Sequence, residues 1–489
     1  MSIPIRLATL LLALSQIGFS RSKIENKIDD LLQSTAWLTQ AQLGYSVLDL
    51  AHGSIVASHD ASKLLAPASN TKLYTTAAAL VRLGPNYKFT TQVRTRGTWK
   101  LGEAYLDDLE LIGGGDPNLS GRVLPYAPGA RFRDPLQALR QLADQLYAAG
   151  IRGIRGDVTG VCARYRGESI PDGWTLDDTF YYYGAPVTDL AINDNAVTLT
   201  IAPAQVQELA DTQLFPPIDH FVVNNQVVTT DSDLSDVHAT RVSGSNEIIV
   251  HGTIGVRAKA WEEEVAIDDP PLFAAEALAQ VLRERGVSIL GSPRAESINL
   301  AFPVASDPGT QLTTYESGPL WQAVQVVNKI SQNLHAEMLL RELGKVVRGD
   351  GTLQAGLDAR DAFLKEIDIP QVGSALEDGS GLARQDLTTP ESTARLLAYM
   401  WTRPERDLWL QSLPIGAKDG SLRERFKNIA GAERVHAKTG SYEHVNTLSG
   451  YIESTPGHWL AFSVMVNGTV VPDSDVHDFL DRFCALFLQ

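Results

Sequence analysis

The sequence predicts an α/β (α+β) protein in which one domain is interrupted by a large β-rich insertion. Strand-like and helix-like stretches occur together near both ends of the chain, whereas the middle consists of short alternating runs separated by Gly, Pro, Asn and Asp. We expect a discontinuous domain formed by residues 21–87 and 301–489, with residues 88–300 forming the inserted β-rich domains.

The first elements after the N-terminal segment form a strand-turn-strand-helix pattern. Residues 44–50 and 54–58 are strand-like and flank turn residues, which predicts a hairpin. Residues 73–83 are rich in Ala and Leu and predict a helix that ends at Gly84 and Pro85, because these residues do not continue a helix. Strands are then expected at residues 89–96, 106–112 and 196–201.

Helix-like and strand-like patterns occur together again in the last part of the chain. A helical pattern covers residues 320–343, just after Pro319, and a second covers residues 391–400. Strands are expected at residues 435–437, 447–452 and 459–466, and an amphipathic helix at residues 473–488 closes the chain.

Composition limits the class of function. The chain has 489 residues, 44% hydrophobic and 20% charged, so it is able to bury a core. The 42 basic and 58 acidic residues give a net charge of −16, and the pI is near 5.1. Nucleic-acid binding depends on clustered Lys and Arg that neutralise phosphates, so the acidic balance without a basic run argues against that class.

The first twenty residues resemble an export signal. Arg6 precedes an apolar run at residues 7–14, and the small residues Gly18 and Ser20 follow, as a signal peptidase requires. The alternative is an uncleaved anchor or a buried helix. No later segment approaches the length of a transmembrane helix. We therefore expect residues 1–20 to be removed and the mature protein to be exported, to the periplasm.

The two cysteines, Cys162 and Cys484, have to be judged in an oxidising compartment, where a disulfide between them is one interpretation. Cys484, however, lies at helical spacing among Val476, Phe479 and Phe483. That pattern favours a buried, inert thiol.

Three short motifs occur in one order: Ser69-Asn70-Thr71-Lys72, Ser331-Gln332-Asn333 and Lys438-Thr439-Gly440. Each alone is weak, because the segment from Ser20 to Lys23 also reads S-x-x-K and the segment from Ser297 to Asn299 also reads S-x-N. Context distinguishes the copies. Ser69 precedes the helix predicted at residues 73–83, so its hydroxyl meets the positive end of the helix dipole.

These residue types fit acyl transfer. A serine hydroxyl is a poor nucleophile until an adjacent base takes its proton, and a partly desolvated lysine of lowered pKa, here Lys72, can be that base. A second hydroxyl with an amide, and a strand carrying a cation and a hydroxyl, add recognition of a carboxylate. Gly440 lacks a side chain that would keep a substrate backbone away.

With these motifs the chain resembles the active-site serine penicillin-recognising enzymes. More narrowly, it resembles the D-alanyl-D-alanine carboxypeptidase/endopeptidase family of the penicillin-binding protein 4 type, peptidase family S13. The resemblance covers nearly the whole mature chain and includes the segments Asn328–Glu337, Asp378–Arg384, Asp419–Leu422, Gly114–Leu119 and Asn193–Asn195. It implies a penicillin-binding/serine β-lactamase-like transpeptidase domain, with two small inserted domains accounting for the long gap between the first two motifs.

The resemblance also implies roles. Ser69 would attack the carbonyl of the penultimate D-alanine of peptidoglycan stem peptides, Lys72 would accept its proton, and Ser331 would pass a proton to the leaving amine. The expected substrate-binding residues are Asn333, Lys438, Thr439, Gly440, Ser441 and Arg384, although Arg384 is equally compatible with a surface ion pair. The N–H groups of Ser69 and Ser441 would form the oxyanion hole. β-Lactams would be covalent inhibitors.

One segment departs from the family pattern. Members that bind a diaminopimelate side chain commonly follow a Gly-Asp/Asn-Val strand with Asp-x-Ser-x-Phe, whereas this chain carries Val161 at the expected acidic position in Gly156–Tyr165. The peptide-branch specificity therefore stays open, with Asp157, Arg164 or Arg384 as groups that would build a different polar pocket.

Two other classes of function stay open: a β-lactamase-type hydrolase, and a catalytically idle peptidoglycan-binding scaffold. Neither a cofactor nor a metal is expected, since His335, His436 and His444 lack metal-ligand spacing. The sequence does not decide between carboxypeptidase and endopeptidase activity, nor does it give the oligomeric state.

Overall fold

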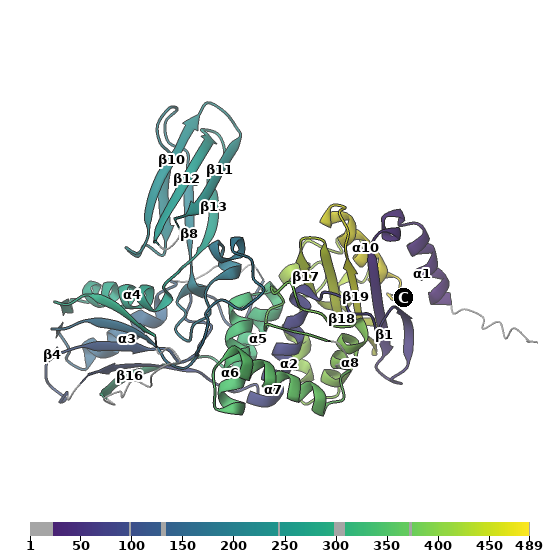
Figure 1. Cartoon of the computed structure of the whole chain (residues 1–489), viewed down its shortest axis with the longest axis horizontal. Coiled ribbons are helices and arrows are strands. Elements are labelled where there is room, and N and C mark those ends of the chain that lie inside the picture. Colours follow the sequence, from purple (N-terminus) through teal and green to yellow (C-terminus); the bar gives the residue numbers. More distant parts are fainter. Residues whose placement is uncertain are drawn as a thin grey trace, which may run out of the picture.

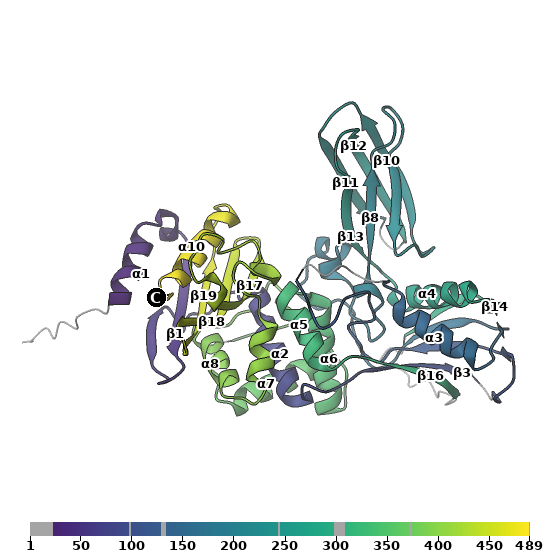
Figure 2. The same cartoon turned by 180° about the vertical axis from the view of Figure 1, so that it is seen from behind.

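The computed structural model describes residues 23–96, 99–128, 134–242, 245–297, 309–370 and 374–488. The N- and C-terminal parts of the chain form one body, and the middle of the chain forms a second body with a long projection (Figure 1). The view from behind shows the same arrangement, with α5 (Leu320–Ile330) and α6 (Asn333–Arg348) near the junction of the two bodies (Figure 2). The predicted export signal, residues 1–20, lies outside the described residues.

The central sheet of the first body joins the two ends of the chain. Its five strands are antiparallel and run in the order β17-β18-β19-β1-β2. The N-terminal hairpin adds to the C-terminal strands through β1 and β19, in the register Gln42↔Asn467 to Asp49↔Leu460. The bounds are β1 Gln42–Asp49, β2 Ile55–His59, β17 Val435–Tyr442, β18 Val445–Thr455 and β19 His458–Asn467. The predicted α/β (α+β) class is confirmed.

Helices cover both faces of this sheet. Along β18, Tyr451 packs in the core formed with α2, α5 and α6, whereas Leu448 and Ile452 pack in the core formed with α1 and α10. This alternation is the two-residue period of a strand that is buried on both faces. The bounds are α1 Lys23–Gln33, α2 Thr71–Leu83, α5 Leu320–Ile330, α6 Asn333–Arg348, α7 Leu353–Glu366, α8 Pro390–Trp401, α9 Arg406–Ser412 and α10 Asp473–Ala485.

The second body contains a mixed five-stranded sheet in the order β15-β7-β5-β3-β16. Helices α3 (Gln137–Ala148) and α4 (Pro270–Glu284) contribute buried residues to the same core as its strands β3, β5 and β7. The strands are β3 Thr90–Thr95, β5 Leu109–Ile112, β7 Val158–Cys162, β15 Pro293–Ser297 and β16 Thr310–Glu316, beside a small sheet of β4 Tyr105–Leu106, β6 Gly153–Ile154 and β14 Ser288–Ile289.

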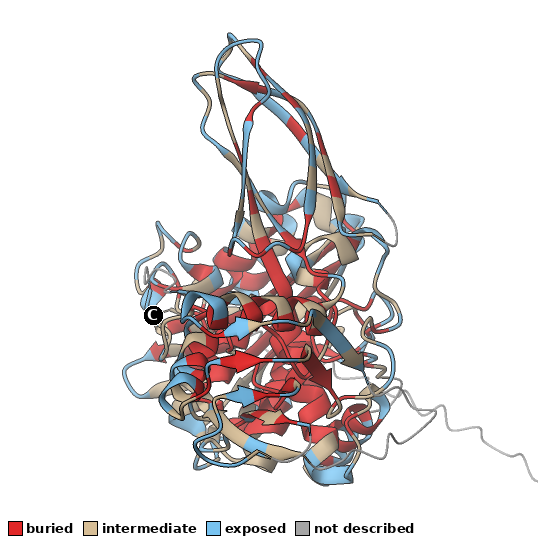
Figure 3. Cartoon of the chain, turned by 90° about the vertical axis from the view of Figure 1, so that its left-hand side faces the viewer, coloured by how far each residue is buried: buried red, intermediate tan, exposed pale blue. Residues whose placement is uncertain are grey.

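Two three-stranded sheets form the projection from the second body (Figure 1). Buried residues gather in the main body of the molecule, and the tip of the projection is largely exposed (Figure 3). The strands are β8 Ala196–Ala202, β9 Asp211–Phe215 and β13 Trp261–Ala266 in one sheet, and β10 Val222–Thr230, β11 Ser235–Arg241 and β12 Glu247–Gly255 in the other.

The division of the chain into residues 21–87 with 301–489 and residues 88–300 stays a prediction, which we retain with one adjustment. Strand β16, placed after the boundary at residue 301, pairs with β3 of the middle sheet from Thr310 to Glu316. The return to the first body therefore falls between β16 and α5, close to Pro319.

Several features differ from the sequence expectations. The helix expected at residues 320–343 is two helices, α5 and α6, because Ser331 adopts a left-handed conformation with φ of 62° and breaks the helix there. The sequence predicts neither α3 nor α4 in the β-rich middle. Ten of the fifteen residues of α4 are buried, so α4 presents no clear amphipathic stripe to identify it.

Both cysteines are unpaired and buried. Cys162 lies in the core of the second body and Cys484 in the core formed by α1, α10 and the central sheet. Burial raises the pKa of both thiols well above the ordinary value. The interpretation of Cys484 as an inert thiol therefore agrees with its environment.

We predict that the denatured protein, never exposed to a reductant, titrates two thiols with a chromogenic disulfide reagent, whereas the native protein titrates none within minutes. The reason is that both thiols are buried and unpaired. The melting temperature should be the same with and without reductant. A lower melting temperature in reductant would show that a disulfide contributes to stability.

Candidate active site

Ser69 lies in a short turn, residues 67–70, that leads into α2; we call it the Ser69 turn. Two hydrogen bonds hold it to β18: the Thr447 hydroxyl donates to the Pro67 carbonyl over 2.8 Å, and the Asn70 amide donates to the Ser449 hydroxyl over 2.8 Å. The turn is therefore attached to the central sheet, which is a rigid platform for a nucleophile.

Lys72 lies in the first turn of α2, three residues after Ser69, and is fully buried. Its Nζ is 2.9 Å from the Ser69 hydroxyl, 2.6 Å from Asn333 Oδ1 and 2.6 Å from the Ser380 carbonyl oxygen. Burial lowers the pKa of Lys72 to about 7, although nearby carboxyl groups, Asp378 first among them, oppose the shift. A substantial share of the amine is thus uncharged near neutral pH.

Ser331 and Asn333 lie where α5 ends and α6 begins, not within a continuous helix. The Gln332 side chain caps α6 by accepting a hydrogen bond from the Leu334 N–H over 3.0 Å. The Asn333 side chain donates through Nδ2 to the Tyr183 carbonyl over 2.8 Å, which turns its oxygen toward Lys72. The break in the helix thus brings a hydroxyl and an amide to one site.

Lys438 lies on β17 and is also fully buried. Its Nζ donates to the Ser331 hydroxyl over 2.8 Å and to the Thr439 carbonyl over 2.6 Å. Burial, followed by the charge of Lys72, lowers the pKa of Lys438 well below its ordinary value. The sequence suggested that Lys438 contacts a substrate carboxylate directly, but in this structure its ammonium faces Ser331.

The hydroxyl beside Lys438 is more accessible. Thr439 is partly exposed, and its Oγ1 donates to the hydroxyl of the exposed Ser421 over 2.7 Å. Ser421 follows Asp419, whose carboxylate forms a buried 2.6 Å ion pair with Lys329. The pair joins the loop that carries Ser421 to the end of α5, two residues before Ser331.

Gly440 allows β17 to pack directly on the Ser69 turn. A Cβ atom at this position would lie 2.7 Å from the Pro67 carbonyl oxygen and 2.9 Å from the Ser69 nitrogen, closer than real Cβ contacts. From the sequence, Gly440 is expected to let a substrate backbone approach. The structure gives a different reason, which is contact with the nucleophile's own backbone.

Arg384 lies at the edge of the site, with about 34% of its side chain exposed. Its guanidinium is 3.6 Å from the Asp178 carboxylate and lies over the Tyr442 ring, 4.4 Å from the ring centre. Tyr442 directly follows Ser441 on β17. Arg384 therefore makes the ion pair that the sequence left open, at a position next to the third motif.

The three motifs predicted from the sequence lie together in the structure, but two contacts of the site are not predicted by it. The Ser380 carbonyl binds the lysine, and Ser421 binds Thr439. Both residues belong to segments quoted for the family resemblance, so a signal was present, but a backbone carbonyl has no signature in a sequence. Within the described part of the chain, no group of three or more His, Cys, Asp and Glu side chains is arranged to hold a metal ion.

Comparisons with known proteins agree with this geometry. The sequence model of the D-Ala-D-Ala carboxypeptidase 3 (S13) family matches residues 24–485. The D-alanyl-D-alanine carboxypeptidase of Actinomadura sp. (strain R39) is 31% identical over 464 residues, covering 92% of this chain and 82% of that protein. The carboxypeptidase DacB of Haemophilus influenzae is 25% identical over 466 residues, covering 93% and 91%.

The fold agrees as well. The crystal structure of penicillin binding protein 4 (dacB) from Haemophilus influenzae superposes with a TM-score of 0.79 at 22% identity, covering 96% of this chain and 100% of that one. The chain therefore belongs to the D-Ala-D-Ala carboxypeptidase 3 (S13) family, and the resemblance found in the motifs is confirmed. It is a serine-type peptidase.

We predict that Gly440→Ala lowers kcat/KM on a D-Ala-D-Ala peptide by about 100-fold, because the added methyl group displaces Ser69 from its position beside Lys72. Gly457→Ala, in the turn between β18 and β19, is the control. Its Cβ would enter open space, although its positive φ costs stability. The control should retain activity per folded molecule, and a Gly440→Ala enzyme of near wild-type kcat/KM would contradict the assignment.

Proposed function

We propose that this protein is a D-Ala-D-Ala carboxypeptidase that cleaves peptidoglycan stem peptides through an acyl-enzyme on Ser69. The observation that carries the proposal is the contact between the buried Lys72 amine and the Ser69 hydroxyl at 2.9 Å. Family membership supports the substrate class, because its name and those of relatives state D-Ala-D-Ala carboxypeptidase.

The contacts of Lys72 define a direction for proton transfer. The Ser380 carbonyl is only an acceptor, and Asn333 presents its oxygen because its NH₂ group is used by Tyr183. A neutral Lys72 amine therefore directs its two N–H bonds to these acceptors and its lone pair to the Ser69 hydroxyl. Ser69 would donate its proton to Lys72 as Oγ bonds to the substrate carbonyl carbon.

Ser331 and Lys438 would act on the leaving group. As the C–N bond breaks, the D-alanine amine needs a proton, and the Ser331 hydroxyl would supply it. The Lys438 Nζ, 2.8 Å from Ser331 Oγ, would stabilise the oxygen while it is short of a proton. The hydroxyls of Thr439 and Ser421 are the exposed donors that would bind the terminal carboxylate, with Lys438 adding positive potential from behind.

The oxyanion that forms during attack needs donors close to Ser69. The predicted pair is the Ser69 N–H and the Ser441 N–H, and the close packing of Gly440 on the Ser69 nitrogen supports this prediction. A donor of this kind is worth roughly 3–4 kcal/mol of transition-state stabilisation. Attack by water on the same carbonyl carbon would then release the acyl group and restore the Ser69 hydroxyl.

The proposal includes inhibition by β-lactams and export. A β-lactam imitates the D-Ala-D-Ala bond, and a crystal structure of the Haemophilus influenzae relative is described as complexed with a novel β-lactam. Export to the periplasm is supported by the apolar run at residues 7–14 and by a substrate that lies in the cell wall. Among the helices that the structure describes, none is long and apolar enough to span a bilayer.

The branch specificity proposed from the sequence concerns Val161, which is 4% exposed on β7. The polar groups nearest in sequence are already paired: Asp157 accepts hydrogen bonds from Arg294 and Ser292, and Arg164 forms a 2.7 Å hydrogen bond with Glu342. These pairings support the proposal that neither group takes the place of the missing carboxylate for a side-chain amine.

We predict that intact-protein mass spectrometry detects the mass of one penicillin on the wild-type protein and none on Ser69→Ala. The acyl group stays on the serine oxygen because the lactam opens without releasing a leaving group. The same spectrum of protein from a native secreting host gives the mature mass and so tests removal of residues 1–20. A Ser69→Ala protein that gained the penicillin mass would refute the nucleophile.

We further predict that kcat/KM for a stem peptide with a free side-chain amine exceeds that for its acetylated twin by less than about tenfold. A charge-assisted hydrogen bond to a carboxylate would give roughly ten- to hundredfold. Masses of the products from purified muropeptides would show at the same time whether cross-links are cut. A preference above tenfold would mean that another carboxylate serves the amine.

A further inference from the structure

One contact of the base comes from outside the three motifs. The Ser380 carbonyl oxygen accepts a 2.6 Å hydrogen bond from Lys72 Nζ, as short as the bond that Lys72 donates to Asn333 Oδ1. Ser380 lies in a tight segment, residues 378–383, which we call the Asp378 turn. The position of this carbonyl fixes one of the two N–H bonds of the neutral amine, and hence the direction of its lone pair toward Ser69.

Asp378 organises this turn with its own carboxylate. One oxygen accepts from the N–H groups of Ser380 and Gly381, at 3.1 and 2.6 Å. The other accepts from the N–H groups of Leu382 and Ala383, at 3.0 and 2.9 Å, and from the Ser380 hydroxyl at 3.0 Å. The buried side chain thus binds nearly every donor of the turn, so its removal would release the Ser380 carbonyl.

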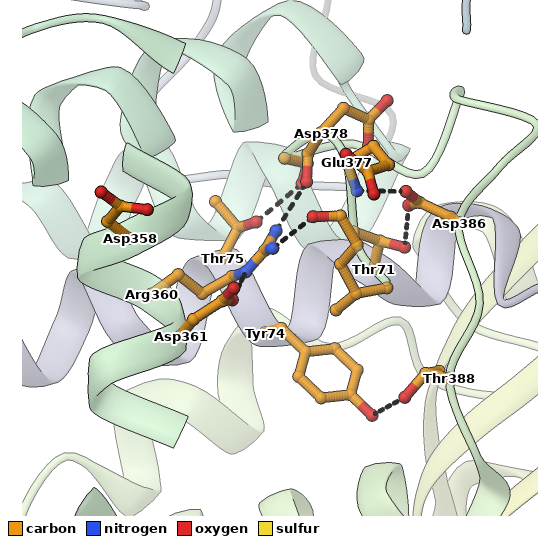
Figure 4. Close-up of polar contacts among 12 residues, drawn as sticks. Thr71, Tyr74, Thr75, Asp358, Arg360, Asp361, Glu377, Asp378, Asp386 and Thr388 are labelled. Atoms are coloured by element: carbon orange, nitrogen blue, oxygen red, sulfur yellow. Dashed lines mark hydrogen bonds and ion pairs between the residues drawn. The ribbon is translucent and has the colours of Figure 1, made fainter. Parts of the chain in front are cut away.

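The surrounding elements hold the turn from several sides, as Figure 4 shows. Arg360 on α7 is fully buried and donates to the Asp378 carbonyl over 2.7 Å and to the Leu376 carbonyl over 2.5 Å. On α2, the Thr75 hydroxyl donates to the Gly379 carbonyl over 2.8 Å. The turn is therefore fixed to the same helix that carries Lys72.

The Glu337 side chain on α6 accepts from the Gly379 N–H over 2.9 Å, and the inserted region supplies a further bond. Trp174, which precedes the short helix Asp177–Phe180, donates its indole N–H to Asp378 over 3.0 Å. The neighbouring Gly173 carbonyl accepts from the Arg384 N–H over 3.3 Å. These two bonds join the inserted region to the Asp378 turn and to Arg384, the residue that directly follows it.

We propose that Asp378 is a positioning residue of the reaction: it holds the Ser380 carbonyl so that the Lys72 lone pair faces Ser69, and Trp174 of the inserted region completes this hold. The inference rests on the proposed function, because it takes Lys72 as the base. It concerns a residue that touches neither substrate nor reacting atoms in the proposed mechanism.

Because Asp378 carries a charge near Lys72, the proposal can also be tested through the pH dependence of acylation. The ionisable groups that influence Lys72 are Asp378 and Asp386 from this loop, Glu337 from α6 and Lys438 from β17. Burial raises the pKa of Glu337 to about 8, so at neutral pH Glu337 supplies little of the negative charge near Lys72. Removal of the Asp378 charge would therefore lower the pKa of Lys72 further.

The experiment measures acylation by a fluorescent penicillin as a function of pH, with the rate expressed per active site titrated by the same reagent. Asp378→Asn replaces one acceptor oxygen with a donor that faces the backbone N–H groups. We expect acylation at pH 7 to be approximately 100-fold slower. We also expect the acidic limb of the pH–rate profile to move down by about 1 pH unit from its wild-type position near 7. On a D-Ala-D-Ala peptide, kcat should fall while KM stays within about threefold, because Thr439 and Ser421 are untouched.

Trp174→Phe is the milder test, since it removes one N–H and keeps an aromatic ring. Its acylation rate per active site should fall about three- to tenfold. The acidic limb of its pH–rate profile should not move, because the Asp378 carboxylate is retained. The matched control is Trp99→Phe, which loses an indole bond to the Glu103 carbonyl at 2.9 Å, away from the site, and should equal wild type.

Three outcomes would overturn the inference. If Asp378→Asn lowers only the number of active sites that penicillin titrates, while the rate per site and its pH profile stay as in the wild type, the role of Asp378 is structural only. If Asp378→Asn does not fold, Trp174→Phe decides, and a wild-type rate per site rejects the proposal. If the wild-type protein takes up no penicillin at Ser69, the proposed function fails first, and this inference fails with it.

Discussion

The site depends on one buried amine. Lys72 is fully removed from solvent, and a charged ammonium in such a place is costly unless it is hydrogen-bonded or deprotonated. The structure meets both conditions, with three hydrogen-bond partners within 2.9 Å and a pKa lowered to about 7. The segments that supply these partners must keep their positions, which constrains the fold around the amine.

Those segments are far apart in sequence. Ser69 leads into α2, Asn333 begins α6, and Ser380 lies in the loop between α7 and α8. They meet because the first and last strands of the chain pair in one sheet, and because β18 binds the Ser69 turn through Thr447. The antiparallel pairing of β1 with β19 therefore gives the site its platform, although neither strand contributes a site residue.

The inserted region also helps to position residues of the site. It provides the Tyr183 carbonyl that orients Asn333 and the Trp174 indole that binds Asp378. It also provides Asp194, which is paired with Arg122 and hydrogen-bonded to His335 and Gln332. Contacts of this kind bind the inserted region to α6, and a half-satisfied buried network would be destabilising, so the two bodies are coupled through their polar groups.

The residue types of the site and the mixed fold class can be predicted from the sequence alone. The three motifs, the hairpin at the start, the strands at residues 447–466 and the closing helix follow from local patterns, because periodicity and turn residues report short-range preferences. The buried position of Cys484 followed from helical spacing for the same reason.

What each of these residues faces depends on the tertiary structure. The burial of Lys438 against Ser331, the role of Gly440 beside the Ser69 nitrogen and the binding of Lys72 by the Ser380 carbonyl each depend on segments brought together by folding. The left-handed Ser331 that divides one apparent helix into two is likewise held by its tertiary neighbours. A local pattern carries no record of such contacts, because their partners lie elsewhere in the chain.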